Sequence, residues 1–231
     1  MLNRIVHHVG SAYIHRLTRA QSERQSFRRM NERPVEYAFV FSWLNRLQPK
    51  TVLDVGTGQS ALPALIRTCG LVVRAVDNVR DYWPKGMVNR HWLVEDEDVR
   101  RAAPREQYDV VLCVSVLEHI RETAAAVRGL HAYASAGGHV VITTPFGELG
   151  HPNVYELDGS YGRDNAYPCR QHSPADLAEW LACGFDLVHA EYWRAFDSNT
   201  WSVGPLLRPI VPSDTPANLG CFVLRKSATE L

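Results

Sequence analysis

A short apolar segment that runs into a glycine-rich turn constrains this chain more than any other feature. Residues 51–60 read Thr-Val-Leu-Asp-Val-Gly-Thr-Gly-Gln-Ser, a pattern typical of a buried strand followed by a turn and the start of a helix. Glycines allow the backbone to approach a ligand closely, and the N–H groups at the start of a helix are free to face it. The segment therefore predicts a strand–turn–helix unit with a ligand at the turn.

Short apolar runs alternate with helical stretches after Lys50, which is typical of a parallel sheet with helices on both faces. We expect parallel strands at Thr51–Val55, Val72–Val76, His91–Val94, Tyr108–Val114 and His139–Thr143. Helices are expected near Ser60–Thr68, Asp98–Ala103, His119–His131 and Pro174–Cys183. Two further strands, Phe185–Tyr192 and Cys221–Arg225, should pair antiparallel, because no helix separates them for a parallel crossover.

Two helices are expected before the sheet. Apolar residues recur at three- and four-residue steps from Leu2 to Leu17, which predicts an amphipathic helix. Residues 1–33 hold seven arginines and two glutamates, so we interpret them as a basic helical extension. We expect this helix to pack on the domain; contact with a membrane surface or with phosphate groups is the alternative. Pro34 begins the second helix, and residues 34–231 form the main domain.

Composition and charge exclude several classes of protein. The 231 residues carry 25 Lys+Arg and 25 Asp+Glu, so no overall charge attracts DNA, and DNA is not an expected partner. The 45% hydrophobic content is typical of a globular domain, and no central apolar run approaches the ~20 residues of a membrane-spanning helix. Five scattered cysteines without C-x-x-C spacing favour reduced thiols. We expect a soluble, cytoplasmic protein, and a homodimer is left open.

An acidic residue, Asp77, follows the second strand 19 residues after Gly58, where a carboxylate can accept both hydroxyls of a ribose. Gly56-x-Gly58-x-x-Ala61 also satisfies the dinucleotide-binding pattern, so an NAD-dependent oxidoreductase is one alternative. Asp54 argues against it, because a carboxylate at the cleft mouth would repel a pyrophosphate and attract a cationic sulfonium or ammonium group. S-adenosylmethionine carries both of these cations, and it is the cofactor that the pattern favours.

Four segments together resemble the successive motifs of class I S-adenosylmethionine-dependent methyltransferases. They are Val52–Gly58, Ala75–Asp77, Tyr108–Ile120 and Gly137–Pro145. The resemblance extends over most of the chain. It implies an α/β fold with a Rossmann-like, doubly wound, seven-stranded sheet that is mostly parallel and has its last strand inserted antiparallel. It also implies that the protein is an enzyme that transfers a methyl group.

The resemblance implies roles for individual residues. Gly56 and Gly58 would pass under the methionine part of the cofactor, and Asp77 would hold its ribose. Asp96, at the end of the third strand, would lie beside the adenine amine; the alternative for this residue is an exposed acidic helix start. Ser115, at the end of the fourth strand, occupies a position that in the family often borders both cofactor and acceptor.

Three histidines are candidates for catalysis. His119 lies where this fold brings the acceptor to the methyl group, and an imidazole with an ordinary pKa of ~6.5 can remove a proton from a hydroxyl. It can equally cap or pack the next helix, because the Val-Leu-Glu-His tetrad occurs in the family with different acceptors. His151 and His172 are the next candidates for a base. No metal site is expected, because Glu118 with two histidines is a thin ligand set for a hard cation.

Residues 146–173, between the fifth strand and the next helix, are expected to form a lid-like insertion. Their polar and aromatic side chains suit a small hydroxylated acceptor, such as a sugar or a phenol, better than an aliphatic lipid. We therefore expect O-methylation of a saccharide or other hydroxylated metabolite. The alternatives are an RNA methyltransferase, supported by the arginines of residues 1–33, and a cofactor-binding regulator without catalysis. Arg33, Glu36 and Tyr37 are further candidates for lining the cleft, by analogy with the family.

Overall fold

The computed structural model describes residues 2–22, 31–83, 86–157, 167–196, 205–211 and 215–227. The chain divides into two compact units, Met1–Met30 and Asn31–Leu231, which are described separately. The first unit holds α1 (Leu2–Ser22), a helix as the apolar pattern predicts. Within the described ranges, no helix combines the length and the apolar character that crossing a membrane requires. The expected boundary at residue 33 stays a prediction.

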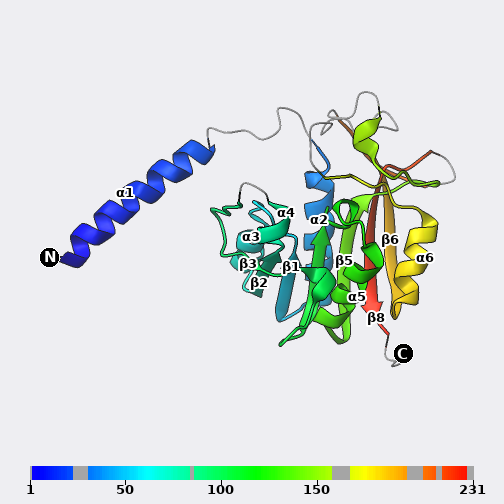
Figure 1. The fold of residues 1–231 in the computed structure, drawn as a ribbon, viewed down its shortest axis with the longest axis horizontal. Helices are drawn as coiled ribbons and strands as arrows, with labels where there is room; N and C mark the ends of the chain where they lie inside the picture. Colours follow the sequence, from blue (N-terminus) through cyan, green and yellow to red (C-terminus); the bar gives the residue numbers. More distant parts are fainter. Residues whose placement is uncertain are drawn as a thin grey trace. The chain divides into compact units, whose positions relative to one another are not determined.

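The second unit is built around an eight-stranded sheet with the order β3-β2-β1-β4-β5-β8-β6-β7 (Figure 1). The strands are β1 (Thr51–Val55), β2 (Val72–Asp77), β3 (Glu95–Asp96), β4 (Tyr108–Val114), β5 (Ala134–Pro145), β6 (Phe185–Phe196), β7 (Pro205–Ile210) and β8 (Leu219–Lys226). The first five run parallel, and β8 is inserted antiparallel between β5 and β6. The predicted Rossmann-like fold is confirmed, including the antiparallel pairing of its last two predicted strands.

β5, β6 and β8 are longer than expected, and two further strands differ in position or existence. The third strand is expected over His91–Val94. The observed strand, β3, consists only of the next two residues, both acidic. Leu93, inside the expected range, is exposed. An eighth strand, β7, lies in the proline-rich segment where none was expected, and it pairs antiparallel with β6. Proline is tolerated in an edge strand, because one side of that strand makes no ladder hydrogen bonds. Pro205 and Pro209 disfavour a strand inside a sheet, because proline lacks the N–H that ladder hydrogen bonds use. At a sheet edge that N–H is not needed.

Two helices are shorter than expected. The helix expected over Asp98–Ala103 is only the 3-10 turn η1 (Val99–Arg101), because the proline at position 104 disfavours a helical conformation for the residue before it. The helix expected over His119–His131 begins at Thr123 instead. It is preceded by the 3-10 turn η2 (Leu117–His119), so His119 lies before this helix and not in it.

Helices cover both faces of the sheet. They are α2 (Arg33–Leu47), α3 (Leu62–Thr68), α4 (Val79–Tyr82), α5 (Thr123–Tyr133) and α6 (Pro174–Ala182), with a third 3-10 turn at η3 (Val154–Glu156). Along β4, Val110 and Leu112 pack into one apolar core with α2 and α3, whereas Val111 and Cys113 pack into a second core with α5 and α6. Successive side chains of a strand point to opposite faces, so this alternation defines a three-layer arrangement of helix, sheet and helix.

The carboxyl ends of the five parallel strands lie along one edge of the sheet, at the top in Figure 1. The chain order reverses at β1, because β2 and β3 lie on one side of it and β4 and β5 on the other. Sheets of this kind bind their ligands outside the carboxyl ends of the strands, at such a reversal. The segment after β5, yellow-green in Figure 1, lies above the same edge. The fold therefore indicates where a site should be sought.

Candidate cofactor and acceptor site

The turn after β1 depends on two glycines with positive φ. Gly56 and Gly58 have φ angles of 73° and 53°, in the left-handed region that favours glycine. A Cβ atom at Gly56 would lie 2.4 Å from a methyl group of Val116, which no side chain can tolerate without movement. The N–H of Gly56 donates to the carbonyl oxygen of Val76 at 2.8 Å and so ties the turn to β2. Backbone shape and available space both require glycine here.

Asp77, at the end of β2, lies beside this turn. Its Oδ2 accepts a hydrogen bond from the N–H of Gly58 at 2.7 Å, and its Oδ1 accepts one from the indole N–H of Trp83 at 3.2 Å. Burial raises the pKa of this carboxyl group, and both hydrogen bonds act against the rise. Each carboxylate oxygen has a second lone pair, so Asp77 retains the capacity to accept from a ribose diol. The structure thus brings two predicted cofactor residues, Gly58 and Asp77, into direct contact.

Asp54 lies under the turn and is almost fully buried. Its Oδ2 accepts a hydrogen bond from the Thr57 hydroxyl at 2.8 Å. Burial, with a smaller contribution from the nearby Asp77, raises the pKa of the carboxyl group to about 7, although the hydrogen bond from Thr57 lowers it. The sequence predicts a carboxylate that opens onto the cleft mouth, but only 2% of Asp54 is exposed, so this prediction is wrong in the described conformation. In the described conformation Asp54 anchors the turn through Thr57, and a nearby cation would favour its charged form.

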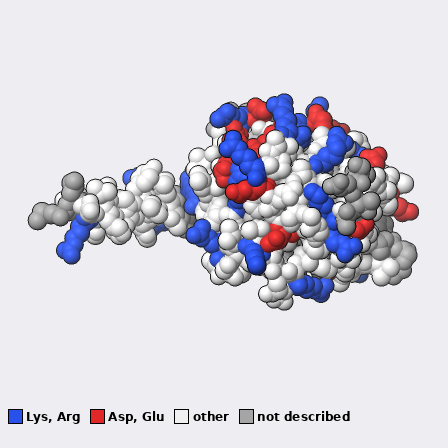
Figure 2. Space-filling model, turned by 90° about the horizontal axis from the view of Figure 1, so that it is seen from below, with Lys and Arg blue, Asp and Glu red and all other residues white. Residues whose placement is uncertain are grey.

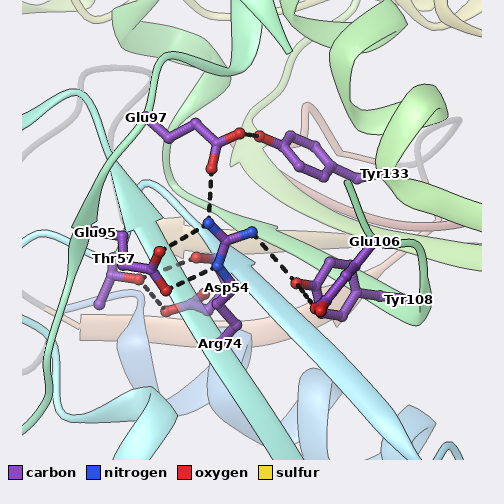
Figure 3. Close-up of polar contacts among 8 residues, drawn as sticks. All are labelled: Asp54, Thr57, Arg74, Glu95, Glu97, Glu106, Tyr108 and Tyr133. Atoms are coloured by element: carbon purple, nitrogen blue, oxygen red, sulfur yellow. Dashed lines mark hydrogen bonds and ion pairs between the residues drawn. The ribbon is translucent and has the colours of Figure 1, made fainter. Parts of the chain in front are cut away.

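A charged network holds β3 against β2 (Figure 3). Arg74 binds the two carboxylate oxygens of Glu95 at 2.8 Å each, and it reaches one oxygen of Glu97 at 3.0 Å. Bidentate arginine–carboxylate pairs combine strength with a defined geometry. This pairing sets the register in which Asp96 lies opposite Asp77.

Asp96 is exposed at this edge of the sheet. Its Oδ1 accepts a hydrogen bond from the backbone N–H of Arg80 at 3.1 Å, and its Oδ2 pairs with the guanidinium of the same residue at 2.8 Å. The residue therefore stands beside the carboxylate predicted to hold a ribose. The contact of Asp96 with an adenine amine stays a prediction.

Glu36 connects α2 to the carboxyl ends of β4 and β5 and has no exposed surface. Its Oε1 accepts hydrogen bonds from the hydroxyls of Ser115 at 2.5 Å and Thr143 at 2.7 Å, while its Oε2 pairs with Arg33 at 2.9 Å. Ser115 has a φ of 52°, which is a strained backbone conformation for a residue other than glycine. The hydrogen bond to a buried carboxylate helps to offset that strain.

Another residue of α2 reaches the glycine-rich turn. The hydroxyl of Tyr37 lies 3.0 Å from that of Ser60. Together with Glu36, this contact shows that the start of α2 lies over the carboxyl ends of three strands. Arg33, Glu36 and Tyr37, which only the analogy with the family suggests, lie together at one edge of the sheet.

Buried acidic groups outnumber basic ones around Arg33. Burial raises the pKa of Glu32 to about 7 and that of Glu118 to about 8. Burial would lower the pKa of Arg33, but the carboxylates of Glu36 and Glu32 raise it above the ordinary arginine value. Among the described residues, the buried Oε2 of Glu32 has no hydrogen-bond partner. A carboxylate oxygen left unpaired in a buried acidic cluster is chemically suited to a cationic group of a ligand.

His119 follows β4 at the end of η2. Its Nδ1 lies 2.8 Å from the carbonyl oxygen of Pro168, so Nδ1 donates this hydrogen bond and the lone pair lies on Nε2. Burial lowers the pKa of the ring to about 4. The imidazole is therefore neutral at physiological pH and holds one nitrogen ready to accept a proton.

Three tyrosine rings surround His119. The ring of Tyr167 meets it edge-on with 4.7 Å between centroids, and Tyr155 and Tyr82 lie at 6.3 Å and 6.4 Å. These rings come from η3, from α4 and from the residues that precede α6. The predicted lid segment 146–173 thus contributes two of the three aromatic neighbours; its residues 158–166 lie outside the described ranges.

The other two candidate histidines are placed differently. His172 has no exposed surface, and its ring packs edge-on against Trp180 at 5.0 Å. Asp176 is 3.9 Å from its Nδ1, too far for a hydrogen bond, and burial lowers the pKa of the ring. His151 forms an isolated bridge with Gln171, and its Nδ1 accepts a hydrogen bond from a backbone N–H. His172 therefore belongs to the core of the second unit.

Three residues of the site were missed by sequence reasoning. Tyr82 and Trp83 approach His119 and Asp77, and the side-chain amide of Asn89 donates to the carbonyl oxygens of Gly58 at 2.8 Å and Ser60 at 2.9 Å. An aromatic pair so soon after Asp77 was the available signal; nothing near Asn89 marked it. In the part of the chain that the structure describes, no three His, Cys, Asp or Glu side chains gather as metal ligands.

Comparison with known proteins shows the family to which the chain belongs. Residues 22–196 match the family described as methyltransferase domain. The chain therefore belongs to this family of methyltransferases. Its fold is that of the class I S-adenosylmethionine-dependent methyltransferases.

The similar proteins differ in their acceptors. The ubiquinone biosynthesis O-methyltransferase of Vibrio vulnificus is 30% identical over 123 residues, 48% of this chain and 50% of that protein. The match thus spans about half the length of the curated relatives. The solved 1,6-didemethyltoxoflavin-N1-methyltransferase of Burkholderia thailandensis has a TM-score of 0.55 at 18% identity, covering 96% of this chain and 90% of its own. Magnesium protoporphyrin IX methyltransferase of Synechocystis has a TM-score of 0.52 at 15% identity, covering 85% and 83%. These structural likenesses show the fold.

Proposed function

We propose that this chain transfers a methyl group from S-adenosylmethionine to a hydroxyl oxygen of a small acceptor, with a phenol-like ring or a sugar as the acceptor class. The observation that carries the proposal is His119, a neutral imidazole that has Nε2 available and is surrounded by aromatic rings at the ligand edge of the sheet. Flat apolar faces with polar edges suit a hydroxylated ring. The printed name of the Vibrio relative, an O-methyltransferase, supports oxygen as the methylated atom.

The residues at the turn fit this cofactor. Asp77 would accept from the ribose hydroxyls, and the turn through Gly56 and Gly58 would pass under the methionine part. The shape of this turn requires glycine at position 56, where a Cβ would collide with Val116. The acid excess around Arg33, with the unpaired oxygen of Glu32, complements a cationic amino group. Asp96 would lie towards the adenine. When bound, S-adenosylmethionine supplies a methyl group already activated by a sulfonium.

The chain's own residues then have two tasks: alignment and proton acceptance. Alignment of the acceptor with the methyl group provides much of the rate in a transfer of this kind. A base with a pKa of about 4 is weak, but it suffices, because an oxygen that is gaining a carbon becomes strongly acidic. His119 Nε2 accepts that proton, and the bond from Nδ1 to Pro168 keeps the ring in the required tautomer.

A paired substitution tests this function. His119→Ala should lower methyl transfer from labelled cofactor to a responsive phenol or sugar ~10²–10⁴-fold, with affinity for S-adenosylhomocysteine within about twofold of wild type. His151→Ala, a histidine in the segment after β5, serves as the matched control and should keep most of the activity. Full activity of His119→Ala would contradict the assigned base. Tight NAD binding without any response to S-adenosylhomocysteine in calorimetry would contradict the cofactor.

A further inference from the structure

The helix α1 separates apolar from polar side chains along its length. Helical spacing places Ile5, Val6, Val9 and Tyr13 on one side. All four are more than half exposed, from 56% for Ile5 to 65% for Val9. The opposite side carries Arg4, His8, Ser11 and His15, and Arg19 lies at its border. Ile14, 64% exposed, lies outside the apolar stripe. An exposed apolar stripe of this size on a helix indicates a surface that binds another protein or a membrane.

The charge of α1 has one sign. Arg4, Arg16 and Arg19 are its arginines, and it contains no aspartate or glutamate. Figure 2 accordingly shows blue and no red side chains on this helix, whereas the drawn face of the second unit mixes both signs. Arg16 falls on the apolar side, where a long side chain can lie along an apolar surface and extend its charged end to phosphate groups. A partner that matches α1 must therefore have an apolar interior and a negatively charged surface.

We propose that α1 binds the surface of an anionic lipid bilayer and lies in the plane of the interface. Its apolar side would enter the boundary between headgroups and acyl chains, and its arginines would meet lipid phosphates. The helix has no stretch long and apolar enough to cross a bilayer, which fits a helix lying on the surface.

Two other partners fit α1 less well. RNA would satisfy the arginines but would leave the exposed valines and isoleucine in water. A second copy of α1 would cover the apolar side, yet it would bring arginines together with no acidic partner from either helix. Of these three partners, the bilayer surface alone complements both the apolar side and the arginines of α1.

Co-sedimentation of the full chain with vesicles tests the proposal. We expect binding to phosphatidylcholine vesicles that contain about a third phosphatidylglycerol, little binding to pure phosphatidylcholine, and weakening with added salt. Val9→Asp introduces a charge on the apolar side, and Ser11→Asp introduces the same charge on the polar side. Val9→Asp should weaken partitioning into the vesicles about tenfold more than Ser11→Asp. Only Val9→Asp replaces a side chain that would enter the apolar region of the interface.

Each other outcome would overturn the proposal. If Val9→Asp and Ser11→Asp lose vesicle binding equally, the contact is electrostatic only and the apolar side does not insert into the bilayer. Binding to RNA but not to vesicles would assign the arginines to nucleic acid. A concentration-dependent mass that Val9→Asp abolishes, without vesicle binding, would assign the apolar side to a second copy. Calorimetry with S-adenosylhomocysteine should give the same affinity for both variants, which separates this test from that of the methyltransferase activity.

Discussion

At Gly56, backbone conformation and packing both exclude a side chain. The expected cost of Gly56→Ala has two parts, the left-handed φ and the collision of a Cβ with Val116. Gly70 has a φ of 86° and nothing within 4 Å of its Cβ position, so Gly70→Ala carries the first part alone. We expect Gly56→Ala to destabilise the protein by about 1–3 kcal/mol more than Gly70→Ala in urea unfolding.

A second substitution separates the two parts at this position. Val116→Ala removes both methyl groups that the new Cβ would meet, so in the Gly56→Ala background it should return part of the lost stability. If the double variant is no more stable than Gly56→Ala, the collision is not the cause. The sequence could predict that Gly56 lies at a ligand-binding turn, but it could not predict Val116, which follows β4 sixty residues later in the chain.

At the level of elements, β3 depends on Arg74 more than on its own length. Two residues make a marginal strand, and the bidentate pair with Glu95 holds it in register. Arg74→Met should therefore lower the free energy of unfolding by about 1–2 kcal/mol. It should also weaken S-adenosylhomocysteine binding, because the proposed adenine contact of Asp96 depends on the register of β3. Arg225→Met, which removes one exposed pair with Asp186, is the control and should cost at most about 0.5 kcal/mol. Equal effects would show that the network does not hold β3.

The same elements show what sequence reasoning could reach. β1, β4 and residues 139–143 of β5 are mostly apolar and buried, so their composition predicts them. β5 begins five residues earlier, at Ala134, in a small-residue segment that composition does not mark. β3 is formed by charged residues whose partner, Arg74, lies in another strand, and β7 is an edge strand with prolines. Both depend on neighbours that are distant in the sequence. The same holds for His119, whose tautomer is set by the carbonyl oxygen of Pro168.

For the whole molecule, buried acids predict how stability changes with pH. The pKa of Glu118 is raised to about 8 and those of Glu32 and Asp54 to about 7, so the folded state holds protons that the unfolded state has released. Their contribution is complete below the unfolded values near 4 and is lost as pH rises through 7 and 8. The melting temperature of the cofactor-free protein should therefore fall from about pH 4.5 to about pH 8 and level off above that range.

Variants assign this decline to a particular group. Glu118→Gln cannot lose a proton in this range, so its melting temperature should fall less steeply than that of wild type. Glu122→Gln changes a nearby glutamate whose pKa is lowered by Arg100, and it should leave the slope unchanged. Identical slopes in all three proteins would contradict the buried, protonated state of Glu118.

The position of β8 has a consequence for synthesis on the ribosome. β8 is the last strand of the sheet in chain order, but it lies between β5 and β6. While the chain emerges, β5 keeps an open edge, and β6 has no neighbour through which to join the sheet. The first five strands can associate as they are made, whereas β6 and β7 must wait until β8 has left the exit tunnel. A pause in translation before β8 would therefore prolong the time during which the edge of β5 is open to pairing with other nascent chains.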